Sequence, residues 1–131
     1  MDSESAKRVV ESYRDLRVYR VAFRLQQEVF ELTQGFPKEE RYALTDQIRR
    51  SSRSVGANIA EAWHKRSYRA HFVSKLSDAD AEAAETRHWL DTAQACGYFR
   101  PAQKQELSAL CRQIGKMLGK MMGEAERWCR S

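Results

Sequence analysis

Proline and glycine are scarce in this chain, with two prolines and six glycines among its 131 residues. Both residue types interrupt helices, and Pro37 and Pro101 each follow an apparent helix end. Such a low content of helix breakers is typical of an all-helical protein. A chain of this length forms one domain that can bury a single core without disulfides or a structural metal.

The sequence also lacks a disulfide framework, a signal peptide and a long hydrophobic run. Cys96, Cys111 and Cys129 are odd in number and share no C-x-x-C spacing, which indicates free thiols in a reducing compartment. The first residues contain no apolar core, and no run of about 18 apolar residues occurs. We therefore expect a cytoplasmic protein with no membrane partner.

Apolar residues recur at alternating spacings of three and four in four segments, which places one face of each helix against a common core. Gly35 with Pro37, and Gly97 with Pro101, mark two breaks between helices. Ser67 marks a third break and can cap the helix that follows it. The short connections predict an all-α, antiparallel up-down-up-down four-helix bundle after a flexible N-terminal leader over residues 1–12. The expected helices span residues 13–34, 38–65, 68–96 and 101–128.

Small residues are concentrated in the second expected helix, in the stretch SSRSVGANIAEAWHKRS at residues 51–67. They predict a close approach to the alanine-rich third helix. Gly56 costs about 1 kcal/mol in a helix interior relative to alanine, so we expect a close contact or a local bend at this position. Asn58 and Glu61 lie three residues apart, and we expect Glu61 to be a partly buried carboxylate that is bonded to Asn58 or to a neighbouring helix. Either arrangement would serve packing or assembly.

Two Glu-x-x-His pairs, Glu61–His64 and Glu85–His88, raise the alternative of a metal- or cofactor-dependent bundle enzyme. The two pairs differ in height along the bundle by roughly 18 Å, so they do not share one dinuclear site. The sequence has no G-x-S-x-G, no H-E-x-x-H, no Walker loop and no glycine-rich dinucleotide turn. We therefore expect no catalytic residues, no metal site, no cofactor and no enzymatic activity.

Basic residues form rows on three of the expected helices and a cluster at the second turn, and the formal net charge is +5. This balance permits binding to phosphates. Exposed helix faces are usually charged, however, and such rows pair with acidic neighbours. A structural or protein-binding oligomer without nucleic-acid affinity therefore stays an alternative. Trp63 and Tyr68 beside the cluster are candidates for stacking on bases. The candidate phosphate contacts are Arg14, Arg17, Arg20, Arg24, Arg49, Arg50, Arg53, Lys65, Arg66 and Arg69, and a further row on the fourth helix is Arg112, Lys116 and Lys120.

Three stretches resemble the four-helix-bundle proteins of the 23S ribosomal RNA intervening-sequence family. They are YRDLRVYRVA (13–22), FPKEERYALTDQIRRS (36–51) and SVGANIAEA (54–62), and the resemblance covers roughly residues 13–99. Gly56 and Ala62 stand where the family pattern has proline and glycine, which implies a second helix that is bent differently.

The resemblance implies a homopentamer, because members of this family form pentameric rings of bundles. A similar bundle is the accessory protein of diversity-generating retroelements, where it works beside a reverse transcriptase and binds nucleic acid. RNA or DNA and a reverse transcriptase are thus the implied partners, and no enzymatic activity is implied. Asn58 and Glu61 then become signature residues of packing or assembly. The leading hypothesis is a non-enzymatic, oligomeric accessory protein that binds nucleic acid through its basic helix faces.

Overall fold

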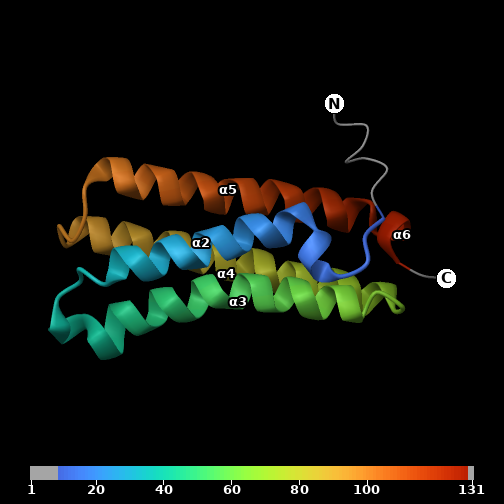
Figure 1. Cartoon of the computed structure of the whole chain (residues 1–131), viewed down its shortest axis with the longest axis horizontal. Coiled ribbons are helices and arrows are strands. Elements are labelled where there is room, and N and C mark those ends of the chain that lie inside the picture. The colour runs from blue at the N-terminus through green and yellow to red at the C-terminus, as the bar shows by residue number, and fades with distance from the viewer. Residues whose placement is uncertain (1–8, 130–131) are drawn as a thin grey trace.

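The computed structural model describes residues 9–129, and every element assigned in this range is helical. Four long helices lie side by side (Figure 1), as the periodicity predicts. No helix of the described range is long and apolar enough to cross a membrane. The long helices are α2 (Arg17–Thr33), α3 (Asp46–His64), α4 (Arg69–Ala95) and α5 (Pro101–Gly123), and the short ones are η1 (Tyr13–Asp15), η2 (Lys38–Glu40), η3 (Arg41–Thr45) and α6 (Ala125–Trp128).

Aromatic contacts at the two ends of the bundle fix the direction of each helix. Phe36, between α2 and α3, has its ring 5.4 Å from that of Tyr98, between α4 and α5. At the opposite end, the ring centroid of Trp63, near the end of α3, lies 6.3 Å from that of Trp128 in α6. The α2–α3 and α4–α5 connections therefore share one end, and consecutive long helices run in opposite directions, as Figure 1 also shows.

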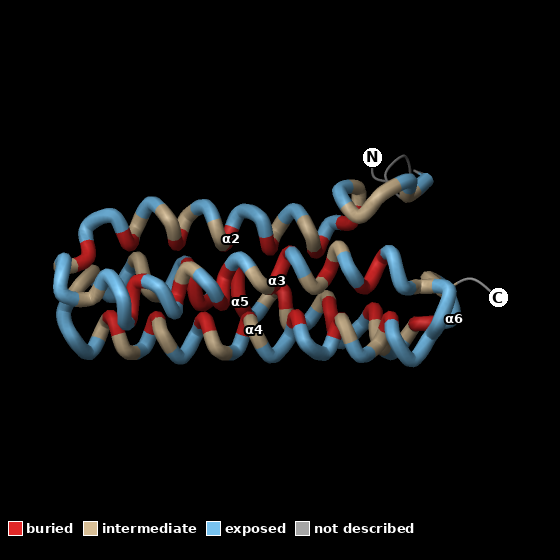
Figure 2. Tube along the Cα trace, turned by 90° about the horizontal axis from the view of Figure 1, so that it is seen from below, coloured by how far each residue is buried: buried red, intermediate tan, exposed pale blue. Residues whose placement is uncertain are grey.

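The core runs along the axis between the four long helices, where the buried residues in Figure 2 face inward. Each predicted apolar stripe supplies part of it, because residues three and four apart share one helix face. Phe23 belongs to a second apolar row on α2 and is 46% exposed. The largest fully buried apolar side chains are Leu25, Val29, Ile48, Val55, Ile59, Phe72, Leu76, Leu90, Ile114 and Leu118.

The first long helix begins later than predicted. Ser12 caps the 3-10 helix η1, with its hydroxyl accepting from the Arg14 amide while the Asp15 carboxylate accepts from the Ser12 amide. Leu16 then takes an extended conformation (φ −72°, ψ 129°), which separates η1 from α2. Arg14 and Arg17 are therefore not on one continuous helix. Residues 1–8 of the predicted leader lie outside the described residues, whereas Val10 packs against the core.

Other helix boundaries also differ from the prediction. The second segment starts as a 3-10 turn and a π-helical turn, η2 and η3, before α-helical geometry begins at Asp46. Gly35 does not provide a left-handed cap, because among the described residues only Gly97 has a positive φ, of 77°. Tyr68, and not Ser67, is the residue before α4, and it makes no capping hydrogen bond through its side chain.

The small residues of α3 divide between two neighbouring helices. Ser51 is buried against α4, where its hydroxyl forms a 2.8 Å hydrogen bond with Thr86. Gly56 faces α2 instead, because a Cβ added there meets Cε1 of Tyr19 at 3.5 Å. That distance is an ordinary van der Waals contact. Gly56 itself lies within the continuous helix α3. The expected close neighbour is therefore present at Gly56, but the space there also admits the Cβ of an alanine.

Replacing Gly56 with alanine is therefore expected to stabilise the protein. The substitution restricts the unfolded chain and adds a side chain that fits, for a gain of about 0.5–1 kcal/mol and a few degrees in Tm. Gly119→Ala is the matched control, since a Cβ there meets nothing within 4 Å in the same kind of helical position. Thermal unfolding of both variants checks the expectation, and a lower Tm for Gly56→Ala alone would contradict it.

The α2–α3 and α4–α5 connections lie at the same end of the bundle, and a hydrogen bond between residues far apart in the sequence joins them. The hydroxyl of Tyr98 donates to Oε2 of Glu40 at 2.7 Å. This bond to a carboxylate, together with burial, raises the pKa of Tyr98 to about 12 from an ordinary value of 10.0. The neutral phenol is thus the form that the folded state favours.

The Tyr98–Glu40 bond predicts a specific loss of stability in alkali. Because the folded pKa is raised, the contribution is fully present below pH 10 and is lost as the pH rises toward about 12. Denaturant unfolding of wild type and Tyr98→Phe at a series of pH values measures it. We expect the wild type to be more stable than the variant below pH 10 and the difference to shrink above it. A difference that does not change with pH over this range would rule the bond out as its source.

Candidate nucleic-acid interface

Three of the ten candidate basic residues form ion pairs within the bundle. Arg24 pairs with Glu28 one turn further along α2, at 2.6 Å. Arg50 reaches from α3 to Glu82 and Glu85 on α4, and the hydrogen bond from Arg50 lowers the pKa of Glu85. Arg69 pairs with Glu126 of α6 at 3.1 Å, although both side chains are largely exposed. Exposed pairs of this kind contribute little stability, but they reduce the charge offered to a phosphate.

Two further candidates bind the backbone. Arg20 donates through Nη1 to the carbonyl oxygen of Asp15 at 3.3 Å, across the break at Leu16. Arg66 donates to the carbonyl oxygen of Trp63 at 2.7 Å and lies 3.8 Å over the Trp63 ring. Trp63 is itself only 6% exposed, so it is not placed to stack on a base. These arginines hold the ends of α2 and α3.

Arg49 and Arg53 differ from the others because aromatic and hydroxyl groups of α2 hold them. Their guanidinium carbons lie 4.7 and 5.7 Å from the ring centroid of Phe30. Nε of Arg49 also donates to Oγ1 of Thr33 at 2.7 Å, and that hydroxyl donates to the carbonyl of Val29 at 2.8 Å. No ion pair to either guanidinium is formed by residues 9–129. Two positive charges are therefore fixed in position without an acidic partner.

The surface around these arginines is hollowed. The first hollow, which we call the arginine hollow, has a volume of about 670 Å³. A second one, the aromatic hollow, has a volume of about 310 Å³ and shares Arg53 and Ala57 with the first. Together they form what we call the α2–α3 groove. The arginine hollow is lined by Asp46, Gln47, Arg49, Arg50, Arg53, Ser54 and Ala57, and the aromatic hollow by Tyr13, Tyr19, Phe23, Gln26, Arg53, Gly56, Ala57 and Ala60.

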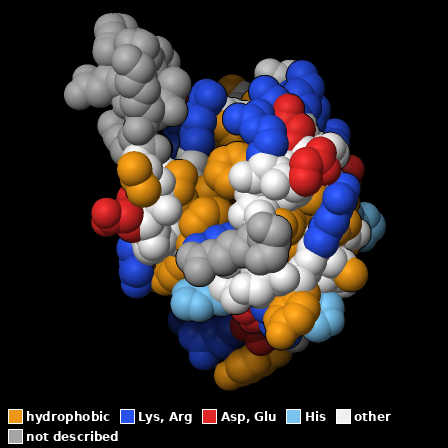
Figure 3. All heavy atoms as spheres, turned by 90° about the vertical axis from the view of Figure 1, so that its right-hand side faces the viewer, with side chains coloured by type: hydrophobic (Ala, Val, Ile, Leu, Met, Phe, Trp, Pro, Cys, Tyr) orange, Lys and Arg blue, Asp and Glu red, His pale blue; other side chains and the backbone are white. Residues whose placement is uncertain are grey.

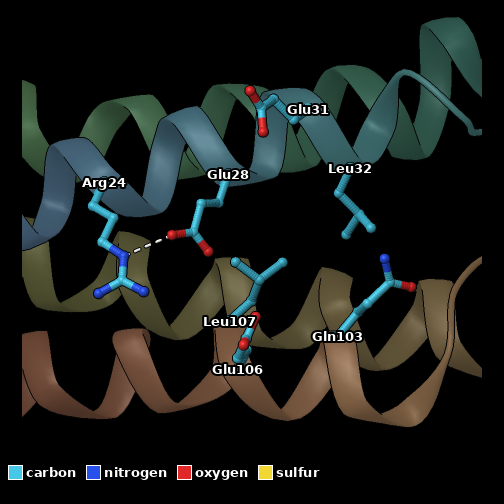
Figure 4. A pocket seen from close by; sticks show the side chains of 7 residues that line it. All are labelled: Arg24, Glu28, Glu31, Leu32, Gln103, Glu106 and Leu107. Carbon is cyan, nitrogen blue, oxygen red and sulfur yellow. Dashed lines mark hydrogen bonds and ion pairs between the residues drawn. The ribbon is translucent and has the colours of Figure 1, made fainter.

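The opposite side of α2 carries an acidic hollow of about 480 Å³ against α5. Figure 4 shows Glu28 and Glu31 of α2 above Glu106 of α5, with Arg24 directed at Glu28. Three carboxylates and one guanidinium thus line the hollow, and the guanidinium is already paired with Glu28, whereas the Glu31 carboxylate points away from it in Figure 4. Such a site repels phosphate, so the two sides of α2 have opposite electrostatic character.

The remaining candidates do not join the groove as one surface. Arg14 stacks over the ring of Tyr13 at 4.7 Å, at the edge of the aromatic hollow. Arg17 lines a separate hollow with Lys120 and Trp128, between α2 and the C-terminal elements. Lys65 is exposed at the α3–α4 turn. Figure 3 shows this end of the bundle, where Lys and Arg side chains are spread among apolar and histidine side chains.

Of the two partners expected for Glu61, the structure shows a neighbouring helix and not Asn58. Nδ2 of Asn58 donates to the carbonyl of Ser54 in its own helix, at 2.9 Å. The side chain of Glu61 is 53% exposed and forms an ion pair with Lys75 of α4 at 2.7 Å. The reason is that Glu61 lies on the outer edge of α3, where a long side chain reaches the neighbouring helix. A contribution of either residue to assembly stays a prediction.

The two Glu-x-x-His pairs are likewise occupied by other contacts. Glu61 binds Lys75, whereas Glu85 accepts from Arg50 and from the indole nitrogen of Trp89. Residues 9–129 contain no group of three or more His, Cys, Asp or Glu side chains placed to hold a metal ion. Cys111 is buried, and this burial raises the pKa of its thiol to about 12, so the nucleophilic thiolate is disfavoured.

Sequence reasoning missed the aromatic side chains of the groove. Tyr19 and Phe23 belong to a second apolar row beside the buried stripe of α2, and neither is among the residues that the sequence predicts for nucleic-acid binding. The sequence did contain a signal for their exposure. Each of these residues is adjacent in sequence to the stripe that contains Ala22, Leu25 and Val29, and that stripe alone accounts for the buried face of α2. A second row on such a helix is left partly exposed.

Comparisons with known proteins identify a family and a similar fold. A search of curated proteins finds no match. A crystal structure of a protein of unknown function from the S23 ribosomal protein family of Bacteroides thetaiotaomicron has 29% sequence identity and a TM-score of 0.73, covering 80% of this chain and 97% of the other. The family model for the 23S rRNA-intervening sequence protein matches residues 14–120. The chain therefore belongs to the 23S rRNA-intervening sequence protein family.

Proposed function

We propose that this protein is a non-enzymatic, oligomeric accessory protein that binds RNA or DNA through the α2–α3 groove. The observation that carries the proposal is the placement of Arg49 and Arg53, which are held on Phe30 and have no acidic partner among the described residues. Membership of a family named after an intervening sequence in ribosomal RNA supports a nucleic-acid partner.

The groove has the chemistry that a phosphate backbone requires. A guanidinium presents several donors in one plane and binds phosphate oxygens with two parallel hydrogen bonds. Because Phe30 contacts both guanidinium groups and Thr33 also binds that of Arg49, less conformational entropy is lost when the two arginines bind phosphate. The paired arginines elsewhere would first have to give up a carboxylate.

A pair of charge-matched double variants separates the groove from the overall charge. Arg49→Gln/Arg53→Gln removes the two uncompensated cations, whereas Arg24→Gln/Arg69→Gln removes two cations that are paired with Glu28 and Glu126. Fluorescence polarisation with RNA and DNA over a series of salt concentrations measures binding. We expect the first double variant to bind more weakly and its log–log salt slope to fall by up to about 2, since each phosphate contact contributes roughly 0.9.

The control double variant is expected to keep a slope close to that of the wild type. Circular dichroism and thermal unfolding verify that both variants are folded. Equal losses in the two double variants would show that net charge alone drives binding and would contradict a site in the groove. No binding by the wild type at low salt would contradict the nucleic-acid function itself.

A homopentameric scaffold that binds proteins is the second candidate function. It is supported by the internal contacts of Arg20, Arg24, Arg50, Arg66 and Arg69, which leave the surface less basic than the sequence suggests. A reverse transcriptase is the protein partner that the family resemblance implies. Light scattering of the samples used for binding distinguishes five copies of the 15.2 kDa chain from one. A monomeric mass would contradict the oligomeric part of the proposal.

A further inference from the structure

Three aromatic rings form one wall of the aromatic hollow. Tyr13 and Tyr19 meet edge to face with their centroids 4.9 Å apart, and Tyr19 and Phe23 lie 6.1 Å apart. Phe23 is 46% exposed, which is unusual for a large apolar side chain on a helix that already buries a complete stripe. The rings thus form a continuous apolar surface that no side chain of the described residues covers completely.

The floor of the same hollow consists of residues with minimal side chains. Gly56, Ala57 and Ala60 of α3 lie opposite the rings of Tyr19 and Phe23. Since these residues extend no further than Cβ, they leave space beside the rings. No acidic side chain of the described range lines the hollow, and its polar side chains, apart from the two tyrosines, are Gln26 and Arg53. The site is therefore apolar on its walls and positively charged at its rim.

We propose that the aromatic hollow stacks one or more unpaired bases of a single-stranded nucleic acid whose backbone is bound by Arg49 and Arg53. The inference rests on the proposed function and specifies its ligand. Unpaired bases stack on exposed aromatic rings regardless of sequence, whereas the bases of a duplex are stacked on one another and are not accessible to such a wall. Rim arginines next to aromatic rings are the combination that binds phosphate and base together.

The dimensions of the groove agree with a short single strand. The two hollows join at Arg53 and Ala57, so a strand can pass from one into the other. The lining residues on α3 extend from Asp46 to Ala60, which corresponds to about 21 Å at 1.5 Å per residue. This length accommodates a short single strand of a few nucleotides. Gln26 supplies an amide that can donate to or accept from a base edge.

The test compares Phe23→Ala with Tyr42→Ala. Tyr42 is 82% exposed and lies in η3, outside the residues that line the groove, so its variant controls for the loss of an exposed aromatic ring. Four probes of about 12 nucleotides are used: a single-stranded RNA, a single-stranded DNA, an abasic strand with the same phosphates, and a duplex. We expect Phe23→Ala to weaken binding of the base-containing single strands by about tenfold. Binding of the abasic strand and the duplex should be unchanged by either variant.

A second variant fills the hollow without removing a ring. Ala60→Leu places a larger side chain among the residues that form the floor, and it should cause a similar loss for base-containing single strands. Unchanged single-strand affinity in Phe23→Ala and Ala60→Leu, or an abasic strand that binds as well as the intact one, would overturn the stacking site while leaving a phosphate-binding function intact. Absence of binding to all four probes at low salt would instead overturn the proposed function.

Discussion

The contact of Arg49 and Arg53 with Phe30 is the interaction on which the functional surface depends. It joins α3 to α2 through a ring face and two guanidinium groups, a geometry in which the positive charge is attracted by the electron-rich face of the ring. The bond from Arg49 to Thr33 orients the first guanidinium, and Thr33 is itself anchored to the backbone of α2. A carboxylate in the place of Phe30 would hold the arginines equally well but would neutralise them.

The other contacts of the bundle explain why this surface stays open. α3 is fixed to α4 by the Arg50 ion pairs and by the buried hydrogen bond between Ser51 and Thr86, so the one arginine on that side is used in the fold. Toward α2, α3 carries Gly56, Ala57 and Ala60, which leave a hollow beside the rings of α2. One helix therefore provides packing on one side and a groove on the other. The hollow between α2 and α5, by contrast, is lined by three carboxylates.

Much of the architecture follows from the sequence, because burial repeats every three to four residues. Residues such as Leu25, Ile59 and Leu118 are predictable from this period, and so are the two proline-marked connections. The break at Leu16 is not, since it depends on a local capping box that competes with helix extension. The turn of π-helix before Asp46 likewise leaves no signal in the apolar period.

The site was less predictable than the fold for a physical reason. A row of arginines gives the positions of the charges along a helix, but their availability depends on which carboxylates lie on the neighbouring helix. Arg50 and Arg53 are three residues apart in one row, yet only Arg50 reaches the glutamates of α4. The same applies to Phe23 and Phe30, whose exposure is set by the small residues and arginines of α3 opposite them.

Photochemical cross-linking tests the central claim most directly. A single-stranded oligonucleotide that carries a photoreactive base is irradiated with the intact protein, and the modified residues are mapped by mass spectrometry. A strand bound in the α2–α3 groove predicts adducts on Tyr19 and Phe23, which line the aromatic hollow. Adducts confined to Arg112, Lys116 and Lys120 of α5 would contradict the account, because these residues lie outside the groove.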